Sequence, residues 1–225
     1  MTARTVVIIP AAGGGSRFGG EIPKQFVPLG GKPILQHAIE RFLLDPLVAR
    51  VIVAIPEPLL PGIAKTETER LRFVAGGETR QASVSRAMKE AGSEMELVAV
   101  HDAVRPFVTM AMFHAVLDAA REFGAAFPGI PVTDTIHTVS DGVLSSTLER
   151  SQLVAAQTPQ CFRRKILQDV LMRAAVSGDQ GTDEAGLAAR YGFQVRVVPG
   201  DPANIKITRR EDMMLAEAYL LELTQ

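Results

Sequence analysis

The chain has 225 residues, a net charge of −1 and 47% hydrophobic residues. This length suits one domain with a sizeable core, and the near-neutral charge excludes a broad basic surface for nucleic acid. The single cysteine, Cys161, excludes an intramolecular disulfide and favours a reducing compartment, so we expect a cytoplasmic protein without a signal peptide or membrane span.

The first predicted element is a buried strand at residues 6–9 that runs into a glycine-rich loop. The loop contains Gly13, Gly14 and Gly15, which lack Cβ atoms, so backbone N–H groups can approach a polyphosphate. Two cations, Arg17 and Lys24, follow the loop and would place positive charge beside the phosphates. The segment therefore predicts a site for a nucleoside triphosphate.

Two commoner phosphate-binding loops do not match this segment. A Walker A loop needs Lys followed by Ser or Thr after its glycines, and neither pair follows here. A dinucleotide-binding loop opens directly into a helix, whereas Phe18 stands where its third glycine would be and Pro23 interrupts. In addition, Glu57 lies between two prolines after the next strand, which makes it a poor ribose-binding acid.

Apolar runs typical of buried strands alternate with segments of helical periodicity. The predicted strands are 6–9, 51–55, 72–74, 97–100 and 125–130, and the predicted helices are 34–44, 81–91 and 111–123. This alternation predicts an α/β fold: a Rossmann-like, mainly parallel sheet covered by helices on both faces, with ligands outside the carboxyl ends of the strands. We expect residues 1–225 to form a single domain.

A second glycine turn, residues 76–83, leads into a predicted helix. Gly77 could admit a flat ring, and Ser83 could hydrogen-bond to a base or a ribose. An ordinary turn with a helix N-cap explains the same residues equally well.

Asp102 and Arg105 follow directly after the predicted strand 97–100, which places them at its carboxyl end. One carboxylate beside a triphosphate is enough to hold Mg²⁺, which keeps waters and takes other ligands from phosphates. Arg105 could bind a second phosphate through two nitrogens. The alternative is a structural Asp–Arg pair that closes a turn before Pro106. We expect His101 to be packed in the core.

Residues at about 133–152 depart from this pattern and are interpreted as an inserted β-arm. Residues 133–148 alternate as two short strands around Asp141 and Gly142, a strong hairpin signal. Because an isolated hairpin is only marginally stable in water, it must pack on something. It either reaches a neighbouring subunit or lies as a flap on its own domain.

Three segments in the C-terminal part of the chain predict further elements: a helix start, a short strand and a last helix. Residues 181–184 are typical of a helix start, with Thr182 as the cap and acids favoured by the helix dipole. Lys206 lies on an apolar segment, 203–208, that we interpret as a short strand, where its charge needs a partner such as a phosphate or Asp102. A last helix is predicted from a capping box at 208–211 to about residue 223.

These motifs occur together in one order along nearly the whole chain. They are Pro-Ala-Ala-Gly-x-Gly-x-Arg, Pro-Lys-Gln-Phe, Gly-Gly-x-x-Arg-x-x-Ser-Val, His-Asp-x-x-Arg-Pro, Arg-Ser…Gln-Thr-Pro-Gln, Thr-Asp-Glu and Asn-Ile-Lys-Ile-Thr. In this order they resemble the 2-C-methyl-D-erythritol 4-phosphate cytidylyltransferases of non-mevalonate isoprenoid synthesis. The resemblance implies a nucleotidyltransferase that transfers the cytidylyl group of CTP to methylerythritol phosphate, giving CDP-methylerythritol and pyrophosphate.

The resemblance also implies residue roles. It makes Arg17, Lys24, Arg150 and Lys206 catalytic, and it assigns Mg²⁺ or another divalent cation to Asp102. The implied nucleotide site comprises Pro10, Ala11, Ala12, Gly13, Gly14, Gly15, Arg17, Lys24, Gly77, Ser83, Asp102 and Lys206. The implied sugar-phosphate site comprises Asp102, Arg105 and Thr182, joined by Thr135 and Arg150 from the arm of a partner subunit in a homodimer.

Three alternatives stay open at this point. The sister ribitol-5-phosphate cytidylyltransferases share the His-Asp-x-Val-Arg-Pro-Phe segment that contains Val104, although residues 147–151 and the Pro-Ala-Ala-Gly opening resemble the methylerythritol enzymes more closely. A sugar-1-phosphate nucleotidyltransferase using UTP or GTP has a similar first loop. A non-catalytic nucleotide-binding module could dispense with Lys24 or Lys206, and both are present.

Overall fold

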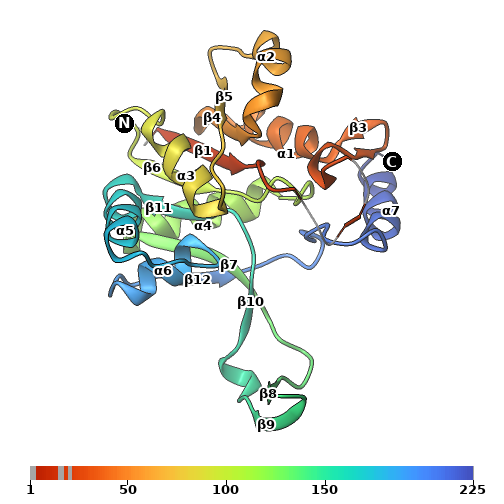
Figure 1. Ribbon diagram of the computed structural model, residues 1–225, viewed down its shortest axis with the longest axis vertical. Helices are drawn as coiled ribbons and strands as arrows, with labels where there is room; N and C mark the ends of the chain where they lie inside the picture. Colours follow the sequence, from red (N-terminus) through yellow and green to blue (C-terminus); the bar gives the residue numbers. More distant parts are fainter. Residues whose placement is uncertain (1–3, 15–17, 20–21, 225) are drawn as a thin grey trace.

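The computed structural model describes residues 4–14, 18–19 and 22–224. Among these residues, eight strands form the central sheet in the order β10-β7-β11-β6-β1-β4-β5, with β12 also paired to β7 (Figure 1). The strands are β1 (Thr5–Pro10), β4 (Val48–Ile55), β5 (Leu71–Ala75), β6 (Leu97–Val100), β7 (Ala125–Pro131), β10 (Val154–Ala156), β11 (Gln160–Arg163) and β12 (Arg196–Pro199).

The sheet is mainly parallel, as the alternation of strands and helices predicts. β1 pairs in parallel with β4 and β6, β4 pairs in parallel with β5, and β12 pairs in parallel with β7. β11 runs antiparallel between β6 and β7, and β10 runs antiparallel at the edge. Pro10 and Val100 therefore end neighbouring parallel strands at the same edge of the sheet, so the loops that follow them lie side by side.

Helices cover both faces of the sheet, which confirms the expected fold class. α1 (Ile34–Leu43) and α4 (Met110–Phe123) pack on one face, and α3 (Arg80–Lys89), α5 (Arg164–Ser177) and α6 (Glu184–Arg190) on the other. In α1, Leu35, Ile39 and Phe42 recur at helical spacing and form one buried stripe against β4. A short helix, α2 (Leu60–Ile63), lies between β4 and β5. No helix in the described ranges combines the length and apolar character needed to span a membrane.

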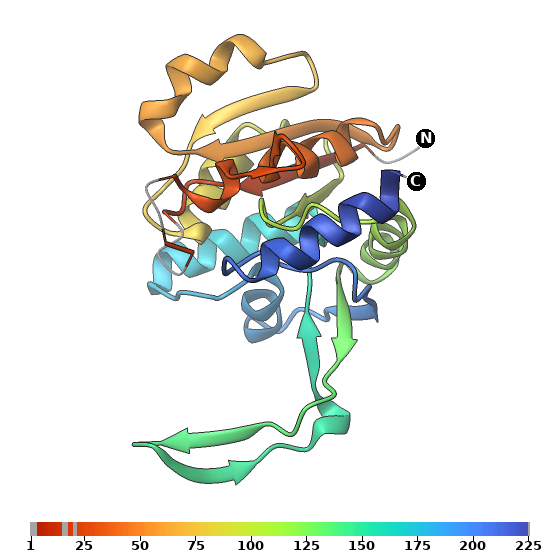
Figure 2. The ribbon, with the colours of Figure 1, turned by 90° about the vertical axis from the view of Figure 1, so that its right-hand side faces the viewer.

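The C-terminal helix α7 (Asp212–Thr224) packs near the small β2 (Pro28–Leu29) and β3 (Lys32–Pro33) pair, as Figure 2 shows. The predicted capping box is wrong, because the helix begins at Asp212 rather than at Thr208. The Asp212 carboxylate accepts hydrogen bonds from the Thr208 N–H (2.7 Å) and the Thr208 hydroxyl (2.9 Å). Asp212 thus fixes the helix start.

The predicted strand at 203–208 is also wrong, because residues 203 and 204 form a turn and a bend and residues 205–208 belong to no sheet. Its Ile207 N–H donates to the Val104 carbonyl (2.9 Å), and the Ile207 side chain is fully buried. The buried Asn204 side chain also donates to the Thr158 carbonyl (2.9 Å), so contacts on both sides of Lys206 hold it beside the loop after β6.

The hairpin prediction is confirmed, with β8 (His137–Ser140) and β9 (Val143–Thr147) joined at Asp141 and Gly142. Both turn residues have positive φ, 51° and 81°, as a two-residue turn that matches the strand twist requires. The hairpin projects away from the sheet (Figures 1 and 2), and its residues are exposed. The flap alternative is therefore wrong: the arm does not lie on its own domain.

Candidate active site

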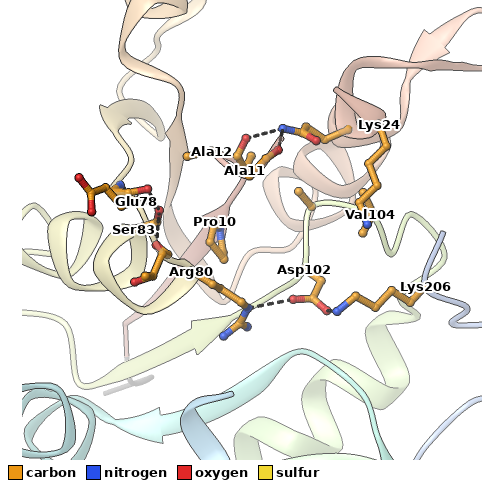
Figure 3. Close-up of a pocket in the computed structure, with 15 residues that line it drawn as sticks. Pro10, Ala11, Ala12, Lys24, Glu78, Arg80, Ser83, Asp102, Val104 and Lys206 are labelled. Carbon is orange, nitrogen blue, oxygen red and sulfur yellow. Dashed lines mark hydrogen bonds and ion pairs between the residues drawn. The ribbon is translucent and has the colours of Figure 1, made fainter. Parts of the chain in front are cut away.

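A cavity of about 330 Å³ opens where β1 and β6 end. Its walls come from the glycine loop, the second glycine turn, the loop after β6 and the segment before α7 (Figure 3). The lining residues are Pro10, Ala11, Ala12, Gly13, Lys24, Gln25, Gly77, Glu78, Thr79, Arg80, Ser83, Asp102, Ala103, Val104 and Lys206. Nine residues assigned to the nucleotide by resemblance are among them; Gly14 is not, and Gly15 and Arg17 lie outside the described residues.

One wall is the loop after β1, and a buried glutamine holds its shape. The Gln25 side-chain amide donates to the carbonyls of Ala11 (2.7 Å) and Gly13 (3.0 Å), and Gln25 is only 3% exposed. Gln25 lies in the short helix η1 (Lys24–Phe26), so the same turn places Lys24 at the cavity. Sequence reasoning gave Gln25 no role, although it stands in the Pro-Lys-Gln-Phe motif.

The opposite wall is the turn that leads into α3. Thr79 caps this helix by accepting from the Ala82 N–H (3.0 Å). The Ser83 hydroxyl accepts from the Gly77 N–H (3.0 Å) and donates to the Thr79 carbonyl (3.0 Å). The helix-cap alternative is therefore correct for Thr79, and Ser83 fixes the turn that forms the cavity wall.

The two walls touch at Gly76, where a side chain has no room. A Cβ atom built on Gly76 would overlap the Cβ of Ala12, and it would also crowd the Ser83 hydroxyl oxygen at 3.1 Å. Neither neighbour is the far end of a flexible side chain, so the walls must move apart to admit a methyl group.

We therefore expect Gly76→Ala to weaken CTP binding and to lower stability by about 1–3 kcal/mol, the usual cost of overpacking. Calorimetric titration with CTP and thermal unfolding measure the two effects. Gly62→Ala is the control, because a Cβ there meets no atom within 4 Å. Unchanged CTP affinity in Gly76→Ala would mean that the contact between the walls does not shape the nucleotide site.

Charged side chains gather around Asp102, which is 7% exposed. Lys206 Nζ lies 2.8 Å from one carboxylate oxygen, and Arg80 Nε lies 3.3 Å from the other. Burial alone would raise the pKa of Asp102, but the charges of Arg80 and Lys206 outweigh burial and hold that pKa well below its usual range. The expectation that Lys206 needs a partner such as Asp102 is confirmed.

Arg80 also contacts a buried acid that sequence reasoning did not single out. Its Nη1 donates to both carboxylate oxygens of Glu184, at 2.8 and 2.6 Å, and the Glu184 side chain is 1% exposed. Figure 3 shows Arg80 and Asp102 between Glu78 and Ser83 on one side and Lys24 and Lys206 on the other. The two lysines thus mark one end of the cavity as positive.

Arg105 binds backbone carbonyls and is not among the residues that line the cavity. Its guanidinium donates to the carbonyls of Asn204 (2.7 Å) and Ala156 (3.4 Å), and it lies 3.7 Å from Asp102. This geometry favours the structural alternative for Arg105. His101 is packed as expected: its Nε2 donates to the Arg105 carbonyl (2.9 Å), and burial lowers its pKa to about 4, so the ring stays neutral.

The residues implied for the sugar phosphate are not brought together within one chain. Thr182 is exposed and precedes α6, and the prediction that it caps that helix is wrong, because Asp183 accepts the capping hydrogen bond from the Gly186 N–H (2.8 Å). Thr135 and Arg150 lie on the arm, where Arg150 donates to the Thr133 carbonyl (2.6 Å). None of these three lines the cavity.

The described side chains could bind a magnesium ion only if other groups supply most of its ligands. In the described part of the chain, no group of three His, Cys, Asp or Glu side chains could enclose a metal ion. Asp102 and Glu78 are the acidic residues that line the cavity, and one carboxylate such as Asp102 suits Mg²⁺ that takes its remaining ligands from water and substrate phosphates. The site therefore fits an ion that arrives with a triphosphate.

Comparisons with known proteins agree on one family. The family model for 2-C-methyl-D-erythritol 4-phosphate cytidylyltransferase matches residues 5–222. Proteins with that name are 42% identical in Solibacter usitatus, over 97% of this chain and 96% of the relative, and 43% identical in Bacillus mycoides, over 95% and 96%. The crystal structure of the Thermus thermophilus enzyme of that name is 36% identical with a TM-score of 0.81, covering 97% of this chain and 98% of that chain. The Francisella tularensis structure is 30% identical with a TM-score of 0.85, covering 96% and 99%.

Proposed function

The chain belongs to the 2-C-methyl-D-erythritol 4-phosphate cytidylyltransferase family, and we propose that the cavity between its two glycine turns binds CTP and houses the reaction. The enzyme transfers the cytidylyl group of CTP to 2-C-methyl-D-erythritol 4-phosphate, giving CDP-methylerythritol and pyrophosphate. One observation supports the location above all: Lys24, Asp102 and Lys206 line the same cavity as the glycine loop.

The nucleophile needs no activation by the protein. A phosphate monoester has a second pKa of about 6, so its oxygen is already ionised near neutral pH. That oxygen attacks the α-phosphorus of CTP, a new P–O bond forms, and the bond to the pyrophosphate oxygen breaks. Among the described residues that line the cavity there is no histidine or cysteine, and this chemistry needs none.

The protein's task is to bring two anions together and to stabilise the charge that develops. Lys24 and Lys206 lie at the positive end of the cavity, where the phosphates of CTP would be held, with Arg17 as a third cation outside the described residues. Backbone N–H groups of the glycine loop add donors, and the turn at Gly77 and Ser83 faces the base and ribose. Asp102 positions Lys206 through their 2.8 Å ion pair.

We propose Mg²⁺ as the cofactor, with Asp102 as the residue that holds it. When bound together with CTP, the ion offsets part of the negative charge of the triphosphate. Among the described cavity residues, Asp102 is the acid that follows β6 directly, at the carboxyl end of a parallel strand.

We expect turnover to stop when Mg²⁺ is chelated, and Asp102→Asn to require a higher Mg²⁺ concentration for half-maximal rate. Removing the carboxylate charge weakens a ligand of the ion and also releases Lys206, so kcat at saturating Mg²⁺ should fall as well. A series of kcat measurements against Mg²⁺ concentration separates the two effects. An unchanged Mg²⁺ dependence would leave Asp102 only its role in positioning Lys206.

We also propose that the enzyme is a homodimer joined through the arm. Val139, Val143 and Leu144 on the arm are 58–68% exposed, and the hairpin contacts little of its own chain. A second subunit would cover these side chains and would bring Thr135 and Arg150 to the neighbouring cavity. A cytoplasmic location is part of the same proposal, and the single buried thiol of Cys161 supports it.

The nucleotide proposal is tested by pyrophosphate release from CTP, UTP and GTP with methylerythritol phosphate present. Release from CTP well above that from the other two is expected. A preference for UTP or GTP would favour a sugar-1-phosphate nucleotidyltransferase instead.

A further inference from the structure

We infer that Glu184 is a positioning residue of this site: by holding Arg80, it keeps Asp102 paired with Lys206. The inference rests on the proposed role of Lys206 in cytidylyl transfer. It concerns a buried side chain that does not line the cavity and that acts through two other residues.

Arg80 is shared between two carboxylates, and the sharing is unequal. Glu184 receives two hydrogen bonds from Nη1, at 2.8 and 2.6 Å, whereas Asp102 receives one from Nε at 3.3 Å. Asp102 directs its other oxygen to Lys206 Nζ at 2.8 Å. Arg80 therefore lies closer to Glu184 than to Asp102, and Asp102 lies closer to Lys206 than to Arg80.

The charges around Asp102 explain why its pairing with Lys206 depends on Glu184. Arg80, Arg105 and Lys206 carry three positive charges around two carboxylates. If Glu184 were neutral, Asp102 would be the remaining anion for all three cations, and a guanidinium binds a carboxylate best through two parallel hydrogen bonds. Arg80 would then turn toward Asp102 and displace Lys206, which is the more exposed of the two at 39% of its side-chain surface.

Other contacts hold α6 in place without the charge of Glu184. Gln81, next to Arg80, donates to the Asp179 carbonyl (3.2 Å) and accepts from the Gly181 N–H (3.2 Å). Asp183 caps α6 and accepts from Gln160 (2.8 Å). A neutral side chain of the same shape at position 184 should therefore leave the fold in place and change only the distribution of charge.

The test is Glu184→Gln, assayed for kcat and for the KM of CTP. We expect kcat to fall by about tenfold or more, with a smaller change in KM for CTP, because the site keeps its cations and loses only the placement of Lys206. Glu122→Gln is the matched control: it makes the same change at an exposed carboxylate of α4 that does not line the cavity, so its kcat should stay unchanged.

Adding Arg80→Met to Glu184→Gln distinguishes positioning from a structural role. Without Arg80 there is no side chain to draw Asp102 from Lys206, so the double variant should recover most of the lost kcat, with a higher KM for CTP if Arg80 also contacts the nucleotide. If Glu184→Gln does not fold, the double variant alone decides: its kcat should lie within about threefold of wild type.

The inference is overturned if Glu184→Gln keeps kcat within about twofold of wild type, or if removing Arg80 does not restore it. If the proposed function itself were wrong, the result would be different: the wild-type protein would release no pyrophosphate from CTP and methylerythritol phosphate. An active wild type with an unaffected Glu184→Gln variant contradicts the positioning role alone.

Discussion

Lys24→Ala is expected to lower kcat by about 10²–10³, comparable to the loss of one donor from a site that stabilises a developing oxyanion. Lys24 lies at the cavity on η1, which follows the glycine loop in the chain, at the end where Lys206 also lies. Charge builds on the phosphates as the pyrophosphate bond breaks, and a fixed cation there stabilises the transition state more than the ground state. The same loss is expected for Arg17→Ala.

Steady-state kinetics with CTP and methylerythritol phosphate measure the effect, and thermal unfolding checks the fold. Stability should change little, since η1 is held by the hydrogen bonds of Gln25 to the loop. Lys89→Ala is the matched control, because Lys89 is exposed at the end of α3 and does not line the cavity. Near-normal turnover of Lys24→Ala would remove Lys24 from the catalytic set.

Mixing Lys24→Ala with Arg150→Ala protein is expected to restore activity that neither variant has alone. Arg150 lies at the base of the projecting arm, away from the residues that line the cavity of its own chain. If the arm reaches a second subunit, one site of a mixed dimer carries both defects and the other site carries none. Random exchange makes about half of the dimers mixed, so about a quarter of all sites should be active.

The matched control mixes Lys24→Ala with Lys206→Ala. Both lysines line the cavity of one chain, so every site in such a mixture keeps one defect and no activity should return. Subunit exchange is verified independently with differently tagged chains. No recovery in the Lys24→Ala and Arg150→Ala mixture, with exchange proven, rejects a site shared between subunits.

Much of the cavity could be predicted from sequence because its parts are contiguous segments at strand ends. The loop at 10–13 follows β1, and Asp102 follows β6, so a parallel sheet brings them together at one edge. The hairpin at Asp141 and Gly142 was predictable for a similar reason, since its signal is local. The direction of the arm was not, because it depends on packing beyond the hairpin.

The sequence analysis anticipated the pairing of Lys206 with Asp102 but missed the contact between Arg80 and Glu184. Arg80 and Glu184 lie 104 residues apart, and neither belongs to a pattern that points to the other. The strands β10, β11 and β12 have only three or four residues each, too short for a periodic signal. At the last helix, Thr208 and Glu211 match a capping box, but the Asp212 carboxylate accepts from the Thr208 and Arg209 N–H groups instead.

The central claim, transfer of a cytidylyl group to methylerythritol phosphate, is tested most directly by the choice of acceptor. The protein is incubated with CTP and Mg²⁺ and either 2-C-methyl-D-erythritol 4-phosphate or ribitol 5-phosphate, and pyrophosphate release gives kcat/KM for each. A value for methylerythritol phosphate well above that for ribitol phosphate is the expected result. Comparable values, or a preference for ribitol phosphate, would contradict it and move the enzyme to the sister activity.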